Sequence, residues 1–420
     1  MAGTDVNSVV LGVGPRVVLL SSEAEAAAEL RSMGVGRAGA DIMAPKGVFR
    51  AARLYDVPLK AAIIIKQEML SKGGEAALPY RAANLDGDSC DVLLMGTVQQ
   101  FSQAISTLKA QPFGLPAIAA DIEATLAAYD APPGYTRIGE RTFRWGERTY
   151  IMGILNVTPD SFSDGGAHSG VNAAVAHAVA MLESGADIID IGGESTRPGS
   201  EPLPLEEELR RVLPVVKRVA LETDAIISID TYKAEVADRC LDLGAHIIND
   251  ITALRGEGDM ASIASRHGAP VVLMHMKGRP WDMQVNPTYT SVVHEVCEFL
   301  RERISFARER GIPACNTIVD PGIGFGKAPE HNLEIMKRLA EFRSLGRPIL
   351  VGASRKGTIG KVLGTPVYDR VYGTAATVAL AVAYGAHIVR VHDVREMAMA
   401  ARMTDAVVKG WREEEDRNGG

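Results

Sequence analysis

The chain has 420 residues, of which 46% are hydrophobic and 23% charged, and its formal net charge is −7. This balance predicts a globular protein of two or three domains, and the acidic charge disfavours nucleic acid or an anionic membrane as the main partner. The four cysteines form no CxxC pair, and no apolar run approaches the ~18 residues of a membrane span, so we expect a cytoplasmic protein.

Residues 1–128 are expected to form a small α+β or α/β domain. Three apolar runs predict strands: RVVLLS (16–21), EAALP (75–79) and DVLLMGT (91–97). Three stretches predict helices: EAEAAAELRSMG (23–34), PLKAAIIIKQEMLSKGG (58–74) and VQQFSQAISTLKA (98–110). GVGRAG (34–39) has the glycine spacing of a dinucleotide site, but it follows a predicted helix and not a strand. We interpret this domain as a dimerisation or regulatory module, with a fused second activity as the alternative.

Residues 129–148 contain paired prolines and alternating charge, which predicts a linker and a short hairpin at the bottom of the next domain. From residue 149 to residue 410, apolar runs alternate with helical stretches. The runs are TYIMGILN (149–156), DIIDIGGE (187–194), AIISIDT (225–231), HIIND (246–250), PVVLMHM (270–276), TIVDPG (317–322), PILVGAS (348–354) and HIVRVHD (387–393). This alternation fits a (β/α)8 TIM barrel better than a doubly wound sheet. Residues 411–420 are expected to be a polar tail.

Polar residues end nearly every predicted barrel strand, while the strand interiors are apolar. They are Asn156, Asp190, Glu194, Asp230, Asn249, Asp250, His275, Asp320, Ser354, Lys356, Arg390 and His392. Any one of them, taken alone, also fits a helix cap or a turn. Because a barrel directs all of its strand ends at one mouth, the whole set predicts an active site there.

These side chains suit a heterocycle that carries a diphosphate. Two carboxylates, an amide and an ammonium match the amino and carbonyl edge of a planar ring: Asp230, Asn249, Asp320 and Lys356. Three residues that we interpret as cationic match a diphosphate: Arg197, Arg390 and His392. Asn156 and the aspartates of the loop after it suit Mg²⁺, and the sequence has no spacing typical of a zinc site.

Eight motifs resemble, in order, those of dihydropteroate synthase, a pterin-binding enzyme. They are GILNVTPDSFSDGG, GADIIDIGGESTRPGS, ISIDT, IIND, LMHMKG, DPGIGFGK, GASRKG and RVHDV. The resemblance covers about residues 145–410. It implies a pterin-binding barrel that joins 6-hydroxymethyl-7,8-dihydropterin diphosphate to p-aminobenzoate, giving 7,8-dihydropteroate and diphosphate. It further implies a largely dissociative displacement assisted by Mg²⁺, under a mobile first loop.

The resemblance also implies roles for individual residues. Pterin contacts match Asp230, Asn249, Met274, Asp320, Phe325, Gly352, Lys356 and Arg390. Anion contacts match Thr196, Arg197, Arg390 and His392, and the Mg²⁺ contact matches Asn156. Contacts to p-aminobenzoate match Phe162, Thr196, Pro198, Ser354 and Lys356. Asp164 is expected to help close the first loop, and catalytic roles are assigned to Asn156, Asp164, Arg197 and Lys356.

Two other functions are considered beside this one. A methyltetrahydrofolate-dependent corrinoid methyltransferase would need a pterin slot without a diphosphate site, so the cationic residues disfavour it. A non-catalytic pterin-binding homologue is disfavoured by the intact set of polar residues. An outward apolar helix near residues 370–384 fits a homodimer, and sulfonamides, which resemble p-aminobenzoate, are expected to compete for its site.

Overall fold

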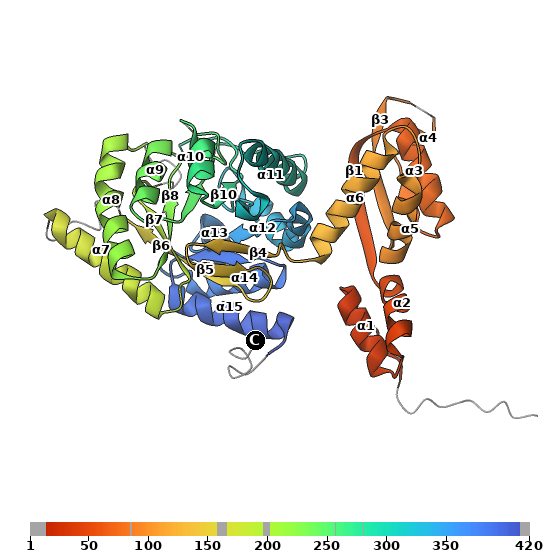
Figure 1. Ribbon diagram of the computed structural model, residues 1–420, viewed down its shortest axis with the longest axis horizontal. Coiled ribbons are helices and arrows are strands. Elements are labelled where there is room, and N and C mark those ends of the chain that lie inside the picture. Colours follow the sequence, from red (N-terminus) through yellow and green to blue (C-terminus); the bar gives the residue numbers. More distant parts are fainter. Residues whose placement is uncertain are drawn as a thin grey trace, which may run out of the picture. The chain divides into compact units, whose positions relative to one another are not determined.

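The computed structural model describes residues 14–84, 86–157, 166–195, 202–256, 258–279 and 281–411. The chain divides into two compact units after Leu126. The first unit contains an antiparallel sheet and the second contains a parallel barrel (Figure 1).

A three-stranded antiparallel sheet, in the order β1-β3-β2, organises the first unit. Its strands are β1 (Phe49–Pro58), β2 (Glu75–Ala77) and β3 (Ser89–Thr97). The helices are α1 (Glu23–Ser32), α2 (Arg37–Gly47), α3 (Leu59–Ser71), α4 (Tyr80–Ala83), α5 (Val98–Leu108) and α6 (Leu115–Asp130). Helices α3 and α5 contact the sheet, where Ile65, Leu94 and Phe101 are buried in one core.

The first unit agrees with part of what its sequence predicts. Helices α1, α3 and α5 and strands β2 and β3 are confirmed. The strand expected for RVVLLS (16–21) is wrong, since these residues form no strand and Val17 and Leu19 are 91% and 85% exposed. Strand β1 escapes prediction because charged residues interrupt its apolar alternation. Its pairing with β3, from Phe49↔Thr97 to Pro58↔Ser89, makes it a strand.

Eight parallel strands form the sheet of the second unit, in the order β11-β10-β9-β8-β7-β6-β13-β12. A bridge between Val319 and Ile349 joins β11 to β12 and closes the barrel. The strands are β6 (Tyr150–Asn156), β7 (Ile188–Gly192), β8 (Ile226–Asp230), β9 (Ile247–Asp250), β10 (Val271–Met274), β11 (Thr317–Asp320), β12 (Leu350–Val351) and β13 (Ile388–Val391). The expected TIM barrel is confirmed, and every strand lies within the apolar run that predicts it.

Helices cover the outside of the barrel (Figure 1). They are α7 (Gly166–Glu183), α8 (Leu205–Glu222), α9 (Ala234–Asp242), α10 (Met260–His267), α11 (Val292–Glu309), α12 (Pro329–Lys337), α13 (Gly357–Leu363), α14 (Val371–Ala383), α15 (Val394–Lys409) and the 3-10 helices η2 (Ala314–Asn316) and η3 (Leu339–Leu345). In α8, the buried residues Leu209, Val212, Val216 and Val219 recur every three or four positions. This stripe packs against the outward side chains of the strands in one continuous core.

A hairpin formed by β4 (Tyr135–Ile138) and β5 (Arg141–Arg144) closes the amino end of the barrel. Its residues Ile138, Phe143 and Trp145 are buried in the layer that fills the barrel interior. The strand residues of that layer are Tyr150, Met152, Ile188, Ile226, Ile247, Val272, Ile318, Leu350 and Ile388. Because the hairpin occupies the amino ends of the strands, a ligand has access at their carboxyl ends.

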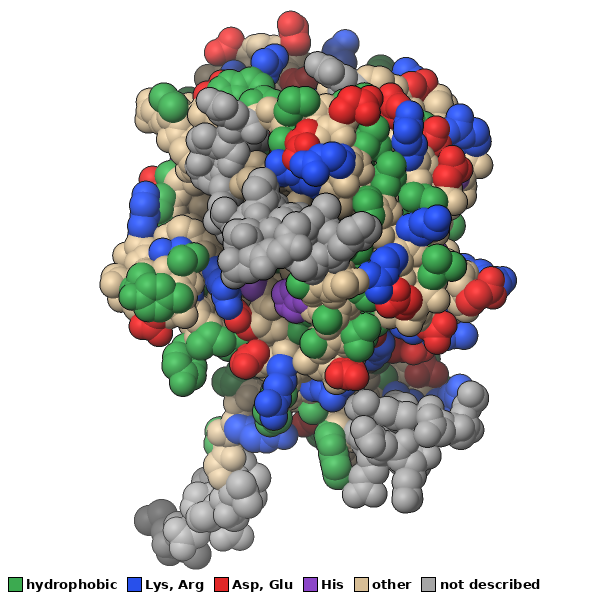
Figure 2. Space-filling model, turned by 90° about the vertical axis from the view of Figure 1, so that its left-hand side faces the viewer, with side chains coloured by type: hydrophobic (Ala, Val, Ile, Leu, Met, Phe, Trp, Pro, Cys, Tyr) green, Lys and Arg blue, Asp and Glu red, His purple; other side chains and the backbone are tan. Residues whose placement is uncertain are grey.

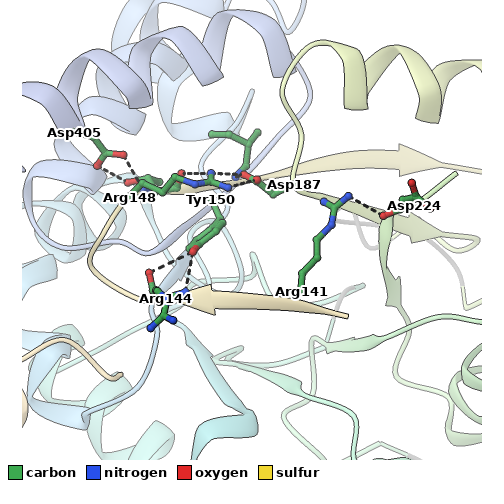
Figure 3. A network of polar contacts seen from close by, with 9 residues as sticks. Arg141, Arg144, Arg148, Tyr150, Asp187, Asp224 and Asp405 are labelled. Carbon is green, nitrogen blue, oxygen red and sulfur yellow. Dashed lines mark hydrogen bonds and ion pairs between the residues drawn. The ribbon is translucent and has the colours of Figure 1, made fainter. Parts of the chain in front are cut away.

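Polar contacts hold the chain in register where it leaves the hairpin and enters the barrel (Figure 3). Arg148 donates to Asp187 from both terminal nitrogens, at 2.9 and 2.5 Å, and its guanidinium lies 4.2 Å from the ring centroid of Tyr150. Asp187 also accepts from the backbone N–H of Ile151 at 2.8 Å. The hydroxyl oxygen of Tyr150 accepts from the backbone N–H of Arg144 at 2.9 Å. Strand β6 is therefore held in place through the side chain of Tyr150 and through the backbone N–H of Ile151.

Basic and acidic side chains are interspersed with hydrophobic ones over the face of the molecule in Figure 2. Such mixing agrees with the modest negative net charge of the chain. In the described part of the chain, every helix is too short or too polar to cross a membrane.

Candidate active site

A cavity of about 1250 Å³ lies at the carboxyl ends of the barrel strands. The predicted site residues that line it are Asn156, Asp230, Phe325, Gly352, Ser354, Lys356, Arg390 and His392. They belong to strands β6, β8 and β13 or to the loops that follow β11, β12 and β13. Residues far apart in the sequence meet here because parallel barrel strands all end at one rim.

Three further predicted residues lie beneath the wall of this cavity. Asn249, Met274 and Asp320 are 5%, 3% and 6% exposed. Met274 packs in an apolar cluster with Phe325. The amide nitrogen of Asn249 donates to Oδ2 of Asp190 at 3.1 Å. These residues therefore form a floor that is apolar on one side and polar on the other.

Arg390 joins two carboxylates above this floor. Its Nε donates to Oδ2 of Asp190 and its Nη2 donates to Oδ2 of Asp230, both at 2.6 Å. Burial disfavours the guanidinium, but the charges of Asp190 and Asp230 raise the pKa of Arg390 above its usual value. In this structure the guanidinium of Arg390 binds the two carboxylates, and its predicted anion and pterin contacts stay predictions. A ligand that hydrogen-bonds to the carboxylate of Asp230 has to do so beside the guanidinium of Arg390, which already binds it.

Burial raises the pKa of both carboxyl groups predicted to hold the ring edge. The pKa of Asp320 is raised to about 6, because burial outweighs the backbone N–H of Gly322, which donates to Oδ1 at 2.7 Å, and the charges of nearby cations. The pKa of Asp230 is raised by burial and by Asp190, while Arg390 opposes the rise. At neutral pH, Asp320 is mostly ionised and acts as a hydrogen-bond acceptor.

Lys356 is held at the mouth of the cavity by the turn that precedes α13. Its Nζ lies 4.2 Å from the ring centroid of Phe325. Arg355 has a φ of 55°, a conformation uncommon for a residue with a side chain, and its Nε donates to Asp393 at 3.0 Å. Arg370 donates from Nη1 to the carbonyl oxygen of Arg355 at 2.9 Å. The ion pair between Arg355 and Asp393 and the hydrogen bond from Arg370 stabilise this strained turn, and the turn positions the side chain of Lys356 at the cavity.

Ser354 and His392 form a hydrogen-bonded pair at the ends of β12 and β13. The Ser354 hydroxyl oxygen accepts from the backbone N–H of His392 at 3.2 Å and lies 3.0 Å from its Nδ1. We assign the hydroxyl proton to the hydrogen bond with Nδ1, which places the ring proton of the neutral imidazole on Nε2. Burial and then Arg390 and Arg355 lower the pKa of His392 to about 4. With this pKa His392 is neutral at neutral pH in the structure without an anion, and its predicted role as an anion contact stays a prediction.

Asn156 is exposed at the end of β6 and lines the cavity, where its amide oxygen could contribute to a cation site. The predicted residues that lie outside the described part of the chain are Phe162, Asp164, Thr196, Arg197 and Pro198. Asp238, Asp242 and His267 also have carboxylate and imidazole atoms within reach of one another. They belong to the outer helices α9 and α10, and His267 already contacts Asp238 at 2.8 Å.

A buried charge network next to the cavity was not predicted. Lys233 lies between Glu194, which lines the cavity, and Glu208, and these carboxylates are 9% and 1% exposed. Tyr232 donates from its hydroxyl to Glu194 at 2.8 Å. The network ties the end of β7 to α8 and to the chain after β8. A sequence signal exists for Glu208, since it lies four residues before Val212 on the apolar stripe of α8.

Comparison with known proteins agrees with this geometry. Residues 152–392 match the family model described as pterin binding enzyme. The dihydropteroate synthase of Synechocystis sp. is 46% identical over 288 residues, which cover 68% of this chain and 98% of that protein. The structure of Xanthomonas albilineans dihydropteroate synthase with 4-aminobenzoic acid is 44% identical with a TM-score of 0.62, and the match covers 66% of this chain and 98% of that one.

A longer match includes part of the first unit. A probable bifunctional folylpolyglutamate synthase/dihydropteroate synthase of Halobacterium salinarum is 43% identical over 369 residues, which cover 88% of this chain and 44% of that protein. Residues 127–420 are too few to account for this match. Part of the first unit therefore has a counterpart in this relative.

Proposed function

The chain belongs to the pterin-binding enzymes, as a dihydropteroate synthase of folate biosynthesis and hence a transferase, and we propose that it joins 6-hydroxymethyl-7,8-dihydropterin diphosphate to p-aminobenzoate in the cavity above the barrel. The observation that carries this proposal is the meeting of ring-binding and anion-binding groups from distant strands at one cavity. The methyltransferase and non-catalytic alternatives gain no support from these relatives.

The pterin ring is proposed to lie between the floor of the site and Lys356. The carboxyl groups of Asp230 and Asp320 accept hydrogen bonds from the ring N–H and amino groups, and the amide of Asn249 contacts the same edge. Phe325 supplies an apolar wall, and Lys356, whose ammonium lies over the Phe325 ring, donates to a ring acceptor. Hydrogen bonds to the ionised form of a carboxyl group are stronger than neutral ones.

The proposed reaction breaks the bond between the pterin methylene carbon and the diphosphate oxygen, and the electron pair leaves with the diphosphate. Positive charge that develops on the pterin is stabilised by Asp230 and Asp320. The Nε2–H of His392 donates to the leaving anion, and Arg390 turns toward it when the pterin takes over part of Asp230. The arylamine nitrogen then bonds to the carbon and loses one proton.

A magnesium ion fits the donor set proposed here. Asn156 would supply an oxygen ligand to the ion, whose preference for oxygen ligands would also suit the diphosphate. The ion would neutralise charge on the diphosphate. Positioning the diphosphate close to Asn156 and His392 is the contribution of the chain itself.

The arylamine is proposed to enter beside Ser354 and Lys356. Ser354 is oriented by its hydrogen bond to His392, and the Lys356 ammonium suits the arylamine carboxylate. The residues matched by resemblance on the other side of this subsite are Phe162, Thr196, Arg197 and Pro198, with Asp164 in the first loop. Sulfonamides are expected to compete for the same subsite, because they resemble p-aminobenzoate.

The proposal is tested by measuring 7,8-dihydropteroate formation from pterin diphosphate, p-aminobenzoate and Mg²⁺. We expect the wild-type chain to form product and Asp230→Asn to lower kcat/KM for the pterin about 100-fold or more, because a buried charged acceptor is lost. Asp242→Asn, which changes a carboxylate that is 70% exposed at the end of α9, is the matched control and should keep wild-type turnover. Pterin binding by the wild type without product would contradict the proposed reaction.

The assembly and location are further parts of the proposal. We propose a homodimer formed through exposed apolar side chains on and next to helices α13 and α14. These side chains are Val362, Leu363, Val367, Tyr368, Tyr372 and Leu380. The cysteines Cys90, Cys240, Cys297 and Cys315 are free thiols, which supports a reducing compartment such as the cytoplasm.

A further inference from the structure

Lys327 ends the glycine-rich loop that follows β11, and its side chain is almost completely buried. It is 2% exposed although it carries an ammonium group. Burial of such a cation is strongly unfavourable unless it is paired or fully hydrogen-bonded. The proposed reaction does not use Lys327, so its burial calls for another explanation.

Four acceptor atoms surround Nζ of Lys327. The carbonyl oxygens of Gly322, Phe325 and His275 lie 2.9, 3.0 and 3.2 Å away, and Nδ1 of His275 lies 2.9 Å away. Burial and then the charge of Lys327 lower the pKa of His275 to about 2, so the ring is neutral and Nδ1 accepts. Because every partner accepts, the arrangement suits a charged ammonium with three protons to donate.

The loop that Lys327 holds is packed directly against the end of β10. A Cβ on Gly322, where φ is +70°, would lie 2.0 Å from the carbonyl oxygen of His275. No side chain fits at Gly322, so the two backbones are in contact there. Lys327 crosses this contact, since it binds carbonyl oxygens on both sides. Its hydrogen bonds therefore hold the loop that follows Asp320 and carries Phe325.

Charge couples Lys327 to Asp320. The cations that act on the Asp320 carboxyl are Lys356 on the loop before α13, Lys327 on its own loop and Arg390 on β13, and each opposes the effect of burial on its pKa. Burial in turn lowers the pKa of Lys327 to about 7, while Asp320 raises it and Lys356 lowers it. The ionised forms of Lys327 and Asp320 thus stabilise each other, as linkage requires.

We propose that Lys327 is a positioning residue for the pterin: its ammonium fixes the loop that carries Phe325 and supplies positive charge that keeps Asp320 ionised. This inference rests on the proposed function, because pterin binding is its readout. A lysine that only stabilised the fold would leave the pH dependence of pterin binding unchanged in a folded variant. That difference makes the two roles separable.

The test is Lys327→Met, which keeps most of the side-chain length and removes the charge. The Kd of the full chain for pterin diphosphate is measured by calorimetry as a function of pH, beside the wild type. Without Lys327, the pKa of Asp320 rises, so the contribution of Asp320 to binding is lost at a higher pH as the solution is acidified. Asp230, whose pKa is raised to about 7, also titrates in this range, but Lys327 is not among the charges that act on it, so the difference between the two profiles reports Asp320. We expect this acid limb to move up by about one pH unit, which is about tenfold weaker binding below it. An unmoved limb in a folded variant would overturn the proposal.

Tyr289→Phe is the matched control for loop position without charge. The Tyr289 hydroxyl donates to the carbonyl oxygen of Gly326, in the same loop, at 2.7 Å. Removing this uncharged hydrogen bond should weaken pterin binding at every pH. It should leave unchanged the pH at which binding is lost on acidification. If Tyr289→Phe moves the limb as far as Lys327→Met does, the charge of Lys327 has no special role.

A second measurement covers the case in which Lys327→Met does not fold. Asp320→Asn retains an oxygen that accepts from Gly322 and should fold. In protein labelled with ¹³C at the lysine Cε, the signal that titrates near neutral pH reports Lys327. By reciprocity, Asp320→Asn should lower its midpoint by about one pH unit. An unchanged midpoint would refute the coupling.

The two proposals fail in different ways. If the wild type does not bind pterin diphosphate, the proposed function is wrong. If the wild type binds it and Lys327→Met binds it with the same pH profile, only the role of Lys327 is wrong.

Discussion

Charged side chains in the active site are buried, and their protonation is set by one another. Arg390 bridges Asp190 and Asp230, while Asp320 relies on a backbone N–H and more distant cations. The paired groups Arg390, Asp190 and Asp230 are stable only as a set, because removing one partner leaves a buried charge uncompensated, whereas ionised Asp320 has no such ion-pair partner in direct contact. In the proposed function, Asp230 and Asp320 of this set hold the ring edge of the pterin.

Asp320 illustrates the cost of this arrangement, and Asp320→Asn should stabilise the protein while weakening pterin binding. The folded-state pKa of Asp320 is raised to about 6, so between its unfolded and folded pKa values the folded protein binds a proton that the unfolded chain does not. The free energy of unfolding therefore falls as pH rises through this window. The shift lowers the free energy of unfolding by at most about 3 kcal/mol once the pH is above the folded-state pKa. Asp320→Asn would remove this loss of stability at such pH values.

Urea denaturation of wild type and Asp320→Asn at an acidic and an alkaline pH tests this prediction. The variant should gain stability on the alkaline side and match the wild type on the acidic side. Equal stability of the two proteins at alkaline pH would show that Asp320 is not destabilising when ionised.

Among the elements, the β4–β5 hairpin has a structural role that is separate from the chemistry. It fills the amino end of the barrel with Ile138, Phe143 and Trp145, whereas the cavity lies at the carboxyl end. Trp145 has its ring edge toward Tyr150, with centroids 5.4 Å apart, and donates from Nε1 to Thr136 at 2.9 Å. The apolar ring of Trp145 is therefore buried, and its Nε1–H has a hydrogen-bond acceptor.

Trp145→Ala should therefore destabilise the barrel without changing its chemistry. We expect a loss of about 3–5 kcal/mol, typical for a buried aromatic side chain replaced by Ala, and an unchanged kcat at a temperature where the variant is folded. Arg137→Ala, on the exposed side of β4, is the control and should cost less than about 0.5 kcal/mol. Denaturant unfolding and initial rates measure the two effects, and a large fall in kcat would contradict the separation.

At the scale of the whole molecule, the first unit accompanies a barrel that relatives possess without it. Its separate core and its own sheet give it the character of a domain. The Synechocystis relative matches 68% of this chain over 98% of its own length, so a complete dihydropteroate synthase does not require such a unit. We retain the proposal that the first unit is a regulatory or dimerisation module.

A chain that begins at residue 127 tests this division. It should fold, form 7,8-dihydropteroate with kcat/KM within about threefold of the full chain, and remain a dimer if α13 and α14 form the interface. Product assays and light scattering measure these properties. A truncated chain that is folded, monomeric and active would assign dimerisation to the first unit. A folded but inactive one would make that unit part of the catalytic assembly.

The barrel and the residue types at its mouth could be predicted because their signals are local. Each strand is a short apolar run that ends in a polar residue, and this pattern places Asp230, Asn249 and Asp320 at strand ends whatever surrounds them. The first unit was harder, since β1 has no apolar alternation and depends on its pairing with β3. RVVLLS has the composition of a strand but forms no strand pairing in the structure.

By itself, the sequence determined the alternation of strands and helices, the position of the site at the strand ends and the family. Tertiary structure alone decided the charge state and partners of the site residues. Arg390 meets Asp190 across 200 positions and Asp230 across 160, His392 becomes neutral through burial, and Lys327 finds acceptors on two loops. Hydrophobic periodicity is a property of neighbours in the chain, whereas desolvation and Coulomb interactions depend on neighbours in space.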